Sequence, residues 1–181
     1  MDHDAFFASL QQAIPGVAFE PAASIDRQAT VYVPAADLHE TLRPLRDRSD
    51  LAFVFLAELT ATDFWPREPR FELTYVLVSF AHRQRLRLKV RLYGNDAHVA
   101  TATDLWPAAN WLEREVWDMF GIVFDGHPDP RRLLMPEDWD GYPLRKDYPV
   151  QIRKGASAAE PLQVTADEFR RSLEKDRLSR R

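Results

Sequence analysis

Apolar residues recur at the three- and four-residue spacing of an amphipathic helix in two N-terminal segments. The first segment, residues 4–14, ends at the Pro15-Gly16 pair. Its apolar residues are Phe6, Phe7, Leu10 and Ile14. The second segment follows Pro34, which the first turn of a helix tolerates, and Pro44 should kink or shorten it. Its apolar face consists of Leu38, Leu42 and Leu45. Between the two segments, Thr30–Val33 predicts a short strand.

The middle of the chain carries three patterns that are typical of β-strands. Leu51–Leu59 is apolar at nearly every position, which predicts a strand covered on both faces. Phe71–Phe80 predicts a second strand, and Arg85–Leu92 alternates between polar and apolar residues. The "AHRQ" sequence between these two suits a hairpin connection. We therefore predict an α+β domain over residues 1–120, with a small antiparallel or mixed sheet and helices packed on it.

The character of the chain changes after residue 120. Prolines and glycines become frequent, yet large side chains such as Phe124, Trp139 and Tyr148 remain common, and disordered linkers lack such side chains. We predict that residues 121–154 form an extended arm that packs on a surface of this chain or of a partner. Residues 155–181 should form a tail with a short helix, because the sequence from Thr165 to Glu168 is a capping box. The apolar anchors of that helix are Phe169 and Leu173.

Composition narrows the classes of function. The 181 residues include no cysteine, which excludes disulfides and thiolate-held metals, among them cysteine-ligated iron–sulfur clusters. A net charge of −4 argues against nucleic acid as the main partner. The acidic start "MDHDAFF" differs from a basic leader, and the longest apolar run has seven residues, far short of the roughly 20 that a membrane helix needs. We expect a soluble intracellular protein or one bound peripherally to a larger body.

Trp111–Arg132, "WLEREVWDMFGIVFDGHPDPRR", has the density of charged and aromatic residues usually found around an active site. Its first half belongs to a predicted helix that Pro107 enters, that Asp104 or a neighbour caps and that Gly121 ends. Arg114 and Asp118 are four residues apart and are predicted to pair. The opposite face is apolar, with Glu115 at its edge. The apolar residues are Ala108, Leu112, Val116, Met119 and Phe120.

Three carboxylates of this helix, Glu113, Glu115 and Asp118, are candidates for acid–base catalysis. Glu115 and Asp118 are three residues apart and can face each other, whereas Glu113 and Glu115 cannot. Acid–base catalysis needs environments that separate two pKa values, and flanking arginines act in the opposite direction. We therefore favour structural ion pairing over catalysis.

The predicted arm contains further candidates. His127 lies between Asp125 and Asp129 and could ligate a metal, but prolines spread these side chains apart, so we expect a turn histidine bonded to backbone or carboxylate. The pairs Arg131-Arg132 and Arg145-Lys146 could bind phosphate, although no glycine-rich loop before a helix accompanies them. We favour bidentate bridges from their guanidinium groups to carboxylates that hold an interface together.

A row of cations follows the third predicted strand, at Arg85, Arg87, Lys89 and Arg91. Such a row could line a nucleic-acid groove, but no stacking aromatics alternate with it. We favour a solvated sheet face or a face opposed by acidic residues.

The helix and the arm also contain two motifs of specific spacing. The first consists of Glu113, Arg114, Glu115, Asp118, Met119, Phe120, His127, Arg131 and Arg132, and the second of Pro143, Leu144, Arg145, Lys146 and Asp147. Together they resemble the family of the 30-kilodalton-type (C-type) subunit of respiratory complex I, the proton-pumping NADH:quinone oxidoreductase. The resemblance is close over Asp104–Val150, recognisable from Leu51 and absent after Lys154. Two positions depart from the family: Met135-Pro136 stands where a Thr-Asp dipeptide is frequent, and Tyr142 where a histidine is common.

This resemblance implies a cofactor-free subunit of the hydrophilic arm of the complex. FMN and iron–sulfur clusters would lie in partner subunits and carry electrons from NADH to quinone, while the complex pumps protons. The resemblance also implies that this chain braces the quinone-reducing module against the large D-type subunit, near the subunit that carries the terminal iron–sulfur cluster. Its place would be peripheral, on the cytoplasmic side of the bacterial inner membrane. The residues of the two motifs would form the partner interface, with no catalytic, cofactor-binding or metal-binding residue in the chain.

Three alternatives remain open at the level of sequence. The chain could be the equivalent subunit of an energy-converting hydrogenase or of a ferredoxin-driven quinone reductase. It could be a free-standing acid–base hydrolase that uses Glu115 and Asp118. It could also be an RNA-binding module that uses the cationic strand.

Overall fold

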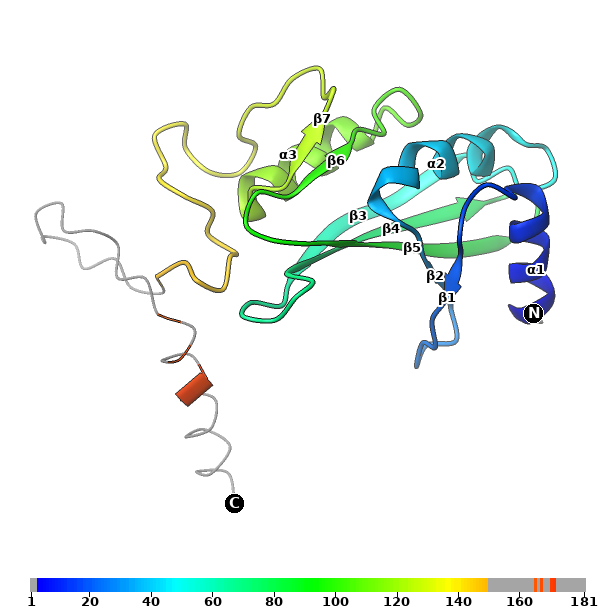
Figure 1. The fold of residues 1–181 in the computed structure, drawn as a ribbon. Helices are drawn as coiled ribbons and strands as arrows, with labels where there is room; N and C mark the ends of the chain where they lie inside the picture. Colours follow the sequence, from blue (N-terminus) through cyan, green and yellow to red (C-terminus); the bar gives the residue numbers. More distant parts are fainter. Residues whose placement is uncertain (1–2, 150–164, 166, 168–169, 172–181) are drawn as a thin grey trace, which may run out of the picture.

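A computed structural model describes residues 3–149, 165, 167 and 170–171, and Figure 1 shows its fold. The α-helices are α1 (His3–Ala13), α2 (Leu38–Asp47) and α3 (Ala109–Phe120), and a 3₁₀ turn (Ala35–Asp37) leads into α2. The strands are β1 (Glu20–Pro21), β2 (Ala29–Tyr32), β3 (Phe55–Asp63), β4 (Phe71–Ser79), β5 (Gln84–Leu92), β6 (His98–Ala100) and β7 (Val123–Asp125). Glu168, Phe169 and Leu173 of the predicted tail helix lie outside the described residues.

The main sheet has five strands in the order β1-β2-β5-β4-β3. Only the β2–β5 pair is parallel, and the other pairs are antiparallel. β4 and β5 form the predicted hairpin, with Ser79 paired to Gln84. The predicted α+β class with a mixed sheet is thus confirmed. A second sheet of two short parallel strands, β6 and β7, lies beside α3 (Figure 1).

The first long strand differs from its prediction. β3 begins at Phe55 rather than Leu51, and its buried and exposed residues mostly alternate. Leu51 and Phe53 are buried ahead of the strand, whereas Val54 and Phe55 are 56% and 47% exposed. The prediction of a strand covered on both faces is therefore wrong. The apolar run led to a wrong prediction because it combines buried residues of a loop with outward-facing residues of an edge strand.

The hydrophobic core lies between the sheet and the helices. Figure 1 shows α2 and α3 above the same face of the sheet and α1 at one end of it. As predicted, Leu38, Leu42 and Leu45 of α2 are fully buried. Pro44 lies inside the helix, which continues to Asp47. The inward-facing residues of β4 and β5 are also buried, namely Phe71, Leu73, Tyr75, Leu77, Leu86, Leu88, Val90 and Leu92.

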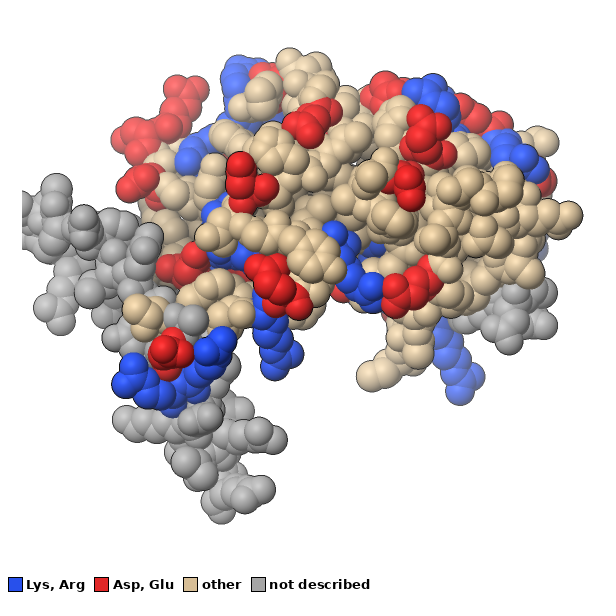
Figure 2. All heavy atoms as spheres, viewed as in Figure 1, with Lys and Arg blue, Asp and Glu red and all other residues tan. Residues whose placement is uncertain are grey.

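The opposite face of the sheet carries the row of cations, and most of them meet a carboxylate. Arg87 pairs with Asp26 at 2.6 Å, and Arg91 pairs with Glu20 at 2.7 Å. Lys89 pairs with Glu72 of β4, also at 2.6 Å. The predicted face opposed by acidic residues is confirmed for these three. Figure 2 shows cationic and acidic side chains interspersed over the face that it displays.

Candidate functional site

The candidate site is the junction between α3 and the arm, whose described part ends at Pro149. Gly121 ends the helix as predicted, with a φ of 72° and an amide that donates to the carbonyl of Trp117. A Cβ at Gly121 would collide with the ring of Tyr142 and the guanidinium of Arg145. The glycine therefore serves both the left-handed turn and the close approach of the returning arm.

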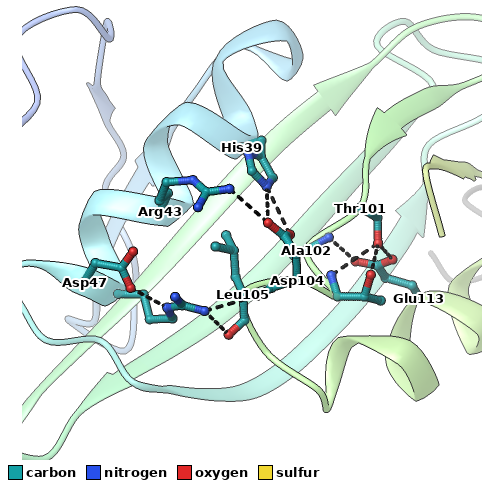
Figure 3. Close-up of polar contacts among 10 residues, drawn as sticks. His39, Arg43, Asp47, Thr101, Ala102, Asp104, Leu105 and Glu113 are labelled. Atoms are coloured by element: carbon teal, nitrogen blue, oxygen red, sulfur yellow. Dashed lines mark hydrogen bonds and ion pairs between the residues drawn. The ribbon is translucent and has the colours of Figure 1, made fainter. Parts of the chain in front are cut away.

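The start of α3 differs from its prediction. Ala108 is the N-cap and supplies no side-chain hydrogen bond. Asp104 instead accepts hydrogen bonds at 3.0 Å from His39 and Arg43 of α2 (Figure 3). The expected cap is wrong because Asp104 ties the loop before α3 to another helix, a contact that local spacing does not reveal.

Asp118 is fully buried at the end of α3 that faces the arm. One of its oxygens accepts the backbone amides of Leu133, Leu134 and Met135 at 3.0, 2.8 and 2.9 Å. The other accepts the guanidinium of Arg132 at 2.6 Å. Burial alone would raise the pKa of Asp118, but these four donors together hold it below its ordinary value. The Asp118 carboxylate is thus the common acceptor at the point where the arm changes direction.

Arg114 and Asp118 do not form the predicted pair, because each has other partners. Arg114 donates to the carbonyls of Arg131 and Arg132, both at 2.9 Å. Its guanidinium also lies 5.1 Å from the centre of the Trp111 ring. The i, i+4 rule failed here because a buried helix face takes its partners from the segment packed on it.

Arg132 connects three parts of the junction. Besides Asp118, it donates to the carbonyls of Trp139 at 2.8 Å and Gly141 at 3.3 Å. Its guanidinium lies over the rings of Trp117 and Tyr142, at 5.6 and 6.0 Å from their centres. A guanidinium fork with these partners fixes the direction of the chain as well as neutralising Asp118.

The other predicted basic residues have different kinds of partner. Arg131 forms the expected bidentate bridge to Asp129, at 2.6 and 2.7 Å. Arg145 instead donates to the carbonyls of Phe120, Gly121 and Asn95. No carboxylate within residues 3–149 is hydrogen-bonded to Arg145, so its predicted carboxylate bridge is wrong. Burial and the neighbouring Arg70 lower the pKa of Arg145.

The second motif returns the arm to the sheet. The amide of Leu144 donates to the carbonyl of Met119 at 3.0 Å, and the amide of Lys146 donates to Asp63 at 2.8 Å. Asp147 pairs with Arg70 at 2.7 Å. Pro143, between these contacts, is half-buried. The backbone and the acid of this motif hold the arm, while the side chains of Leu144 and Lys146 are exposed.

Arg70 is a central residue that sequence reasoning missed. Its guanidinium is almost completely buried and contacts Asp63, Asp147 and Asn95. Burial opposes its charge, but hydrogen bonds to Asp147 and Asp63 raise the pKa of Arg70 overall. The available signal was Asp63, since its position in β3 places a carboxylate on the buried face, where it needs a cation.

Glu113 is fully buried near the other end of α3. It accepts hydrogen bonds from the Thr101 hydroxyl at 2.5 Å and the Ala102 amide at 2.6 Å (Figure 3). Its Oε2 lies 4.0 Å from Nε2 of His127, and no arginine or lysine among the described residues forms an ion pair with it. Burial raises the pKa of Glu113 to about 7, against the two hydrogen bonds, and Asp104 contributes in the same direction as burial. The arginine pairing expected for Glu113 is therefore wrong.

The Glu115–Asp118 pair has no geometry for joint acid–base catalysis, because Glu115 is exposed and Asp118 is buried. The helical wheel placed Glu115 beside the apolar stripe, whereas the structure buries Glu113. His127 is bonded to backbone, as predicted: its Nδ1 accepts the Asp129 amide at 3.0 Å, and its Nε2 lies 3.2 Å from the Asn110 carbonyl. The described residues contain no cluster of three or more His, Asp or Glu side chains suited to a metal.

The junction is therefore built to hold a shape. Asp118, Arg132 and Arg145 use their charged groups on this chain itself. In contrast, Trp111 and Leu134 are 57% and 60% exposed. Such an arrangement can present a rigid surface with apolar side chains on it to another molecule.

Comparison with known proteins shows which family the chain resembles. Residues 31–154 match the model of the family described as "Respiratory-chain NADH dehydrogenase, 30 Kd subunit". The chain is 45% identical over 150 residues to the C subunit of the NADH-quinone oxidoreductase of Roseiflexus castenholzii, an alignment that covers 83% of this chain and 86% of that protein. It is 42% identical over 159 residues to the C/D subunit of the NADH-quinone oxidoreductase of Methylococcus capsulatus, covering 84% of this chain and 26% of that longer protein.

Two solved structures share the fold. A trypsin-resistant fragment of Nqo5 matches with a TM-score of 0.58 and 32% identity, covering 71% of this chain and 99% of the fragment. A chain of the membrane-bound sulfane sulfur reductase, an archaeal respiratory membrane complex, matches with a TM-score of 0.70 and 27% identity, covering 83% of this chain and 87% of that one. None of the helices in the described part of the chain has the length and hydropathy needed to cross a bilayer.

Proposed function

Because this chain belongs to the family of the 30 Kd subunit of respiratory-chain NADH dehydrogenase, we propose that it braces the quinone-reducing module in the hydrophilic arm of a proton-translocating NADH:quinone oxidoreductase. In this role it holds no cofactor and supplies no catalytic group. FMN and iron–sulfur clusters in partner subunits carry the electrons. Small displacements still matter, since electron transfer and quinone docking depend on ångström-scale placement of groups held by those partners.

The observation that carries this proposal is the Asp118 centre. Four donors from the arm keep this buried carboxylate ionised, which disfavours a role in proton transfer, and they fix the course of residues 132–135. The exposed side chains of Trp111, Leu134 and Leu144 are then held in place for a partner. The residues of the two motifs thus act as a scaffold for the interface.

The main partner in this proposal is the large D-type subunit. In the C/D proteins of Methylococcus capsulatus and Nitrosospira multiformis, a region similar to this chain is part of one longer polypeptide. Fusion holds two regions at a high effective concentration, which supports contact between the separate subunits. The second partner is the subunit that carries the terminal iron–sulfur cluster. The complex places this chain on the cytoplasmic side of the bacterial inner membrane, bound only through its partners.

Two arginine variants test the scaffold. Arg132→Ala removes the charged one of the four donors that join Asp118 to the arm, and losing one partner of a buried ion pair costs about 3–5 kcal/mol. We expect a tagged Arg132→Ala chain to recover far less of the partner subunits from native membranes than the wild-type chain does. Arg48→Ala is the matched control, because Arg48 is exposed, lies outside the two motifs and pairs with Asp50 two residues away. Equal recovery with both variants would contradict the proposal.

A second candidate function keeps the same fold but places the chain in a different respiratory complex. The match to a chain of an archaeal sulfane sulfur reductase complex favours it, because related chains serve respiratory complexes with other chemistry. The chain would then belong to an energy-converting hydrogenase or a ferredoxin-driven quinone reductase. Mass spectrometry of the co-purifying subunits separates the two candidates: a flavin-bearing NADH-oxidising subunit supports the first, and hydrogenase or ferredoxin-oxidising subunits support the second.

A further inference from the structure

A second exposed apolar surface lies at the end of β3 away from the arm. Val54, Phe55 and Phe80 are 56%, 47% and 64% exposed, and the rings of Phe55 and Phe80 lie 5.6 Å apart. Val78 is opposite Phe55 in the register of β3 and β4 and shares its sheet face. We call Val54, Phe55, Val78 and Phe80 the distal patch.

The distal patch and the arm occupy opposite ends of one rigid element. Asp63, at the last residue of β3, accepts the amide of Lys146 in the arm, whereas Phe55 is the first residue of the strand. A strand of nine residues spans about 26 Å between its ends. Figure 1 shows the start of β3 near α1, and the ring of Phe53 meets that of Phe6 in α1 at 6.4 Å.

The cations beside the patch distinguish it from the rest of the open sheet face. Three members of the cationic row have carboxylate partners within the chain, but Arg85, opposite Val78, has none among residues 3–149. Arg83 in the adjoining turn also has no ion-pair partner in that range. Glu58 lies one row farther along the sheet, opposite Val76. The patch is therefore apolar at its centre and carries at one side two guanidinium groups that have no ion-pair partner among residues 3–149.

The turn that carries Phe80 and Arg83 is held in place. His82 Nε2 lies 2.9 Å from the carbonyl of Ser49, and the His82 amide donates to the Ser79 hydroxyl at 3.4 Å. A preformed surface binds with less loss of side-chain freedom than a surface that must order first. Paired aromatic rings flanked by arginines also have the composition enriched at the centres of protein interfaces.

We propose that the distal patch docks a second subunit of the same complex, through a segment that presents apolar side chains flanked by Asp or Glu. The apolar side chains cover the Phe55 and Phe80 rings, and the carboxylates pair with Arg83 and Arg85. This proposal rests on the proposed function and extends it. The chain braces the assembly by contacting one body at the arm and another about 26 Å away along β3.

Site-specific photo-crosslinking in the intact complex tests the patch. Replacing Phe80 with p-benzoylphenylalanine should give a crosslink to a different subunit, mapped to a segment rich in apolar and acidic residues. Ile25 is the control position, because it is apolar and fully exposed but lies in a different loop. Crosslinking from position 80 at or below the level at position 25 would overturn the proposal, and so would a crosslink to lipid or to a second copy of this chain.

Charge variants at Arg85 test the acidic component of the partner. Arg85→Glu should reduce the Phe80 crosslink about tenfold, because an attraction becomes a repulsion, and Arg85→Gln should reduce it less. The exposed position of Arg85 makes both variants compatible with folding, which circular dichroism checks. An unchanged crosslink in a folded Arg85→Glu variant would contradict the proposal. If the wild-type chain recovers no partner subunits, the proposed function itself fails, whereas normal recovery without the position-80 crosslink removes only the second docking surface.

Discussion

Two carboxylates on the same helix are buried to the same extent and differ in their surroundings. Asp118 has an arginine and three amides, all from the arm, and its pKa lies below the ordinary value. Glu113 has one hydroxyl and one amide from the segment after β6, and burial raises its pKa to about 7. Burial alone thus does not decide ionisation. The number and charge of the donors that the packed segment supplies act against burial and contribute to the difference.

The difference assigns separate roles to the two ends of α3. The Asp118 end holds a permanent charge, and its hydrogen bonds hold the arm. The Glu113 end contains a group that changes protonation near neutral pH, inside the domain rather than at the arm. Variants that remove either carboxylate or one of its donors therefore test the comparison.

The largest effect is expected for Asp118→Ala. The variant leaves the Arg132 guanidinium and three backbone amides without their acceptor, and breaking a buried pair in this way costs about 3–5 kcal/mol. Urea unfolding of the purified chain measures the loss of free energy of unfolding. Glu115→Ala is the matched control, since Glu115 is exposed on the same helix and should cost no more than about 0.5 kcal/mol. Equal losses in the two variants would remove the central role given to Asp118.

A smaller effect, dependent on pH, is expected for Glu113→Gln. The folded pKa of Glu113 is raised to about 7 from an ordinary value of 4.5, so folding favours the protonated form. Its contribution to stability is fully present below pH 4.5 and is lost as the pH rises through about 7. The wild-type chain should lose about 3 kcal/mol more than Glu113→Gln between these limits. Urea unfolding at several pH values measures this difference, and parallel pH profiles would contradict the assignment.

The smallest effect is expected for Thr101→Val. The Thr101 hydroxyl donates to Glu113 and lowers its pKa, so its removal should raise that pKa further. Losing one such hydrogen bond costs about 1–3 kcal/mol in the ionised state and less in the protonated state. Nuclear magnetic resonance titration of the Glu113 carboxyl carbon measures the shift. Thr103→Val offers a control, because the Thr103 hydroxyl contacts Thr101 rather than Glu113. A pKa that falls in Thr101→Val would contradict the account.

The sequence was sufficient for the parts of the fold that local patterns determine. Alternation in residues 85–92, the helical spacing of Leu38, Leu42 and Leu45, and the glycine at position 121 each predicted an observed feature. The boundary proposed at residue 120 stays a prediction, and β7 continues beyond it as a partner of β6. What failed depended on distant partners: Asp104 with α2, Arg114 with arm carbonyls and Arg145 with three carbonyls. Arg70 could not be found by spacing, since Asp147 lies 77 positions away in the sequence.

Turnover per assembled complex in the Arg132→Ala variant tests the central claim most directly. Membranes from wild-type and variant cells are compared for the amount of assembled complex, by native electrophoresis, and for NADH:quinone oxidoreductase activity. The account predicts less assembled complex in the variant and an unchanged turnover for each complex that does assemble. Normal assembly with strongly reduced turnover would contradict it and would place Arg132 in the chemistry.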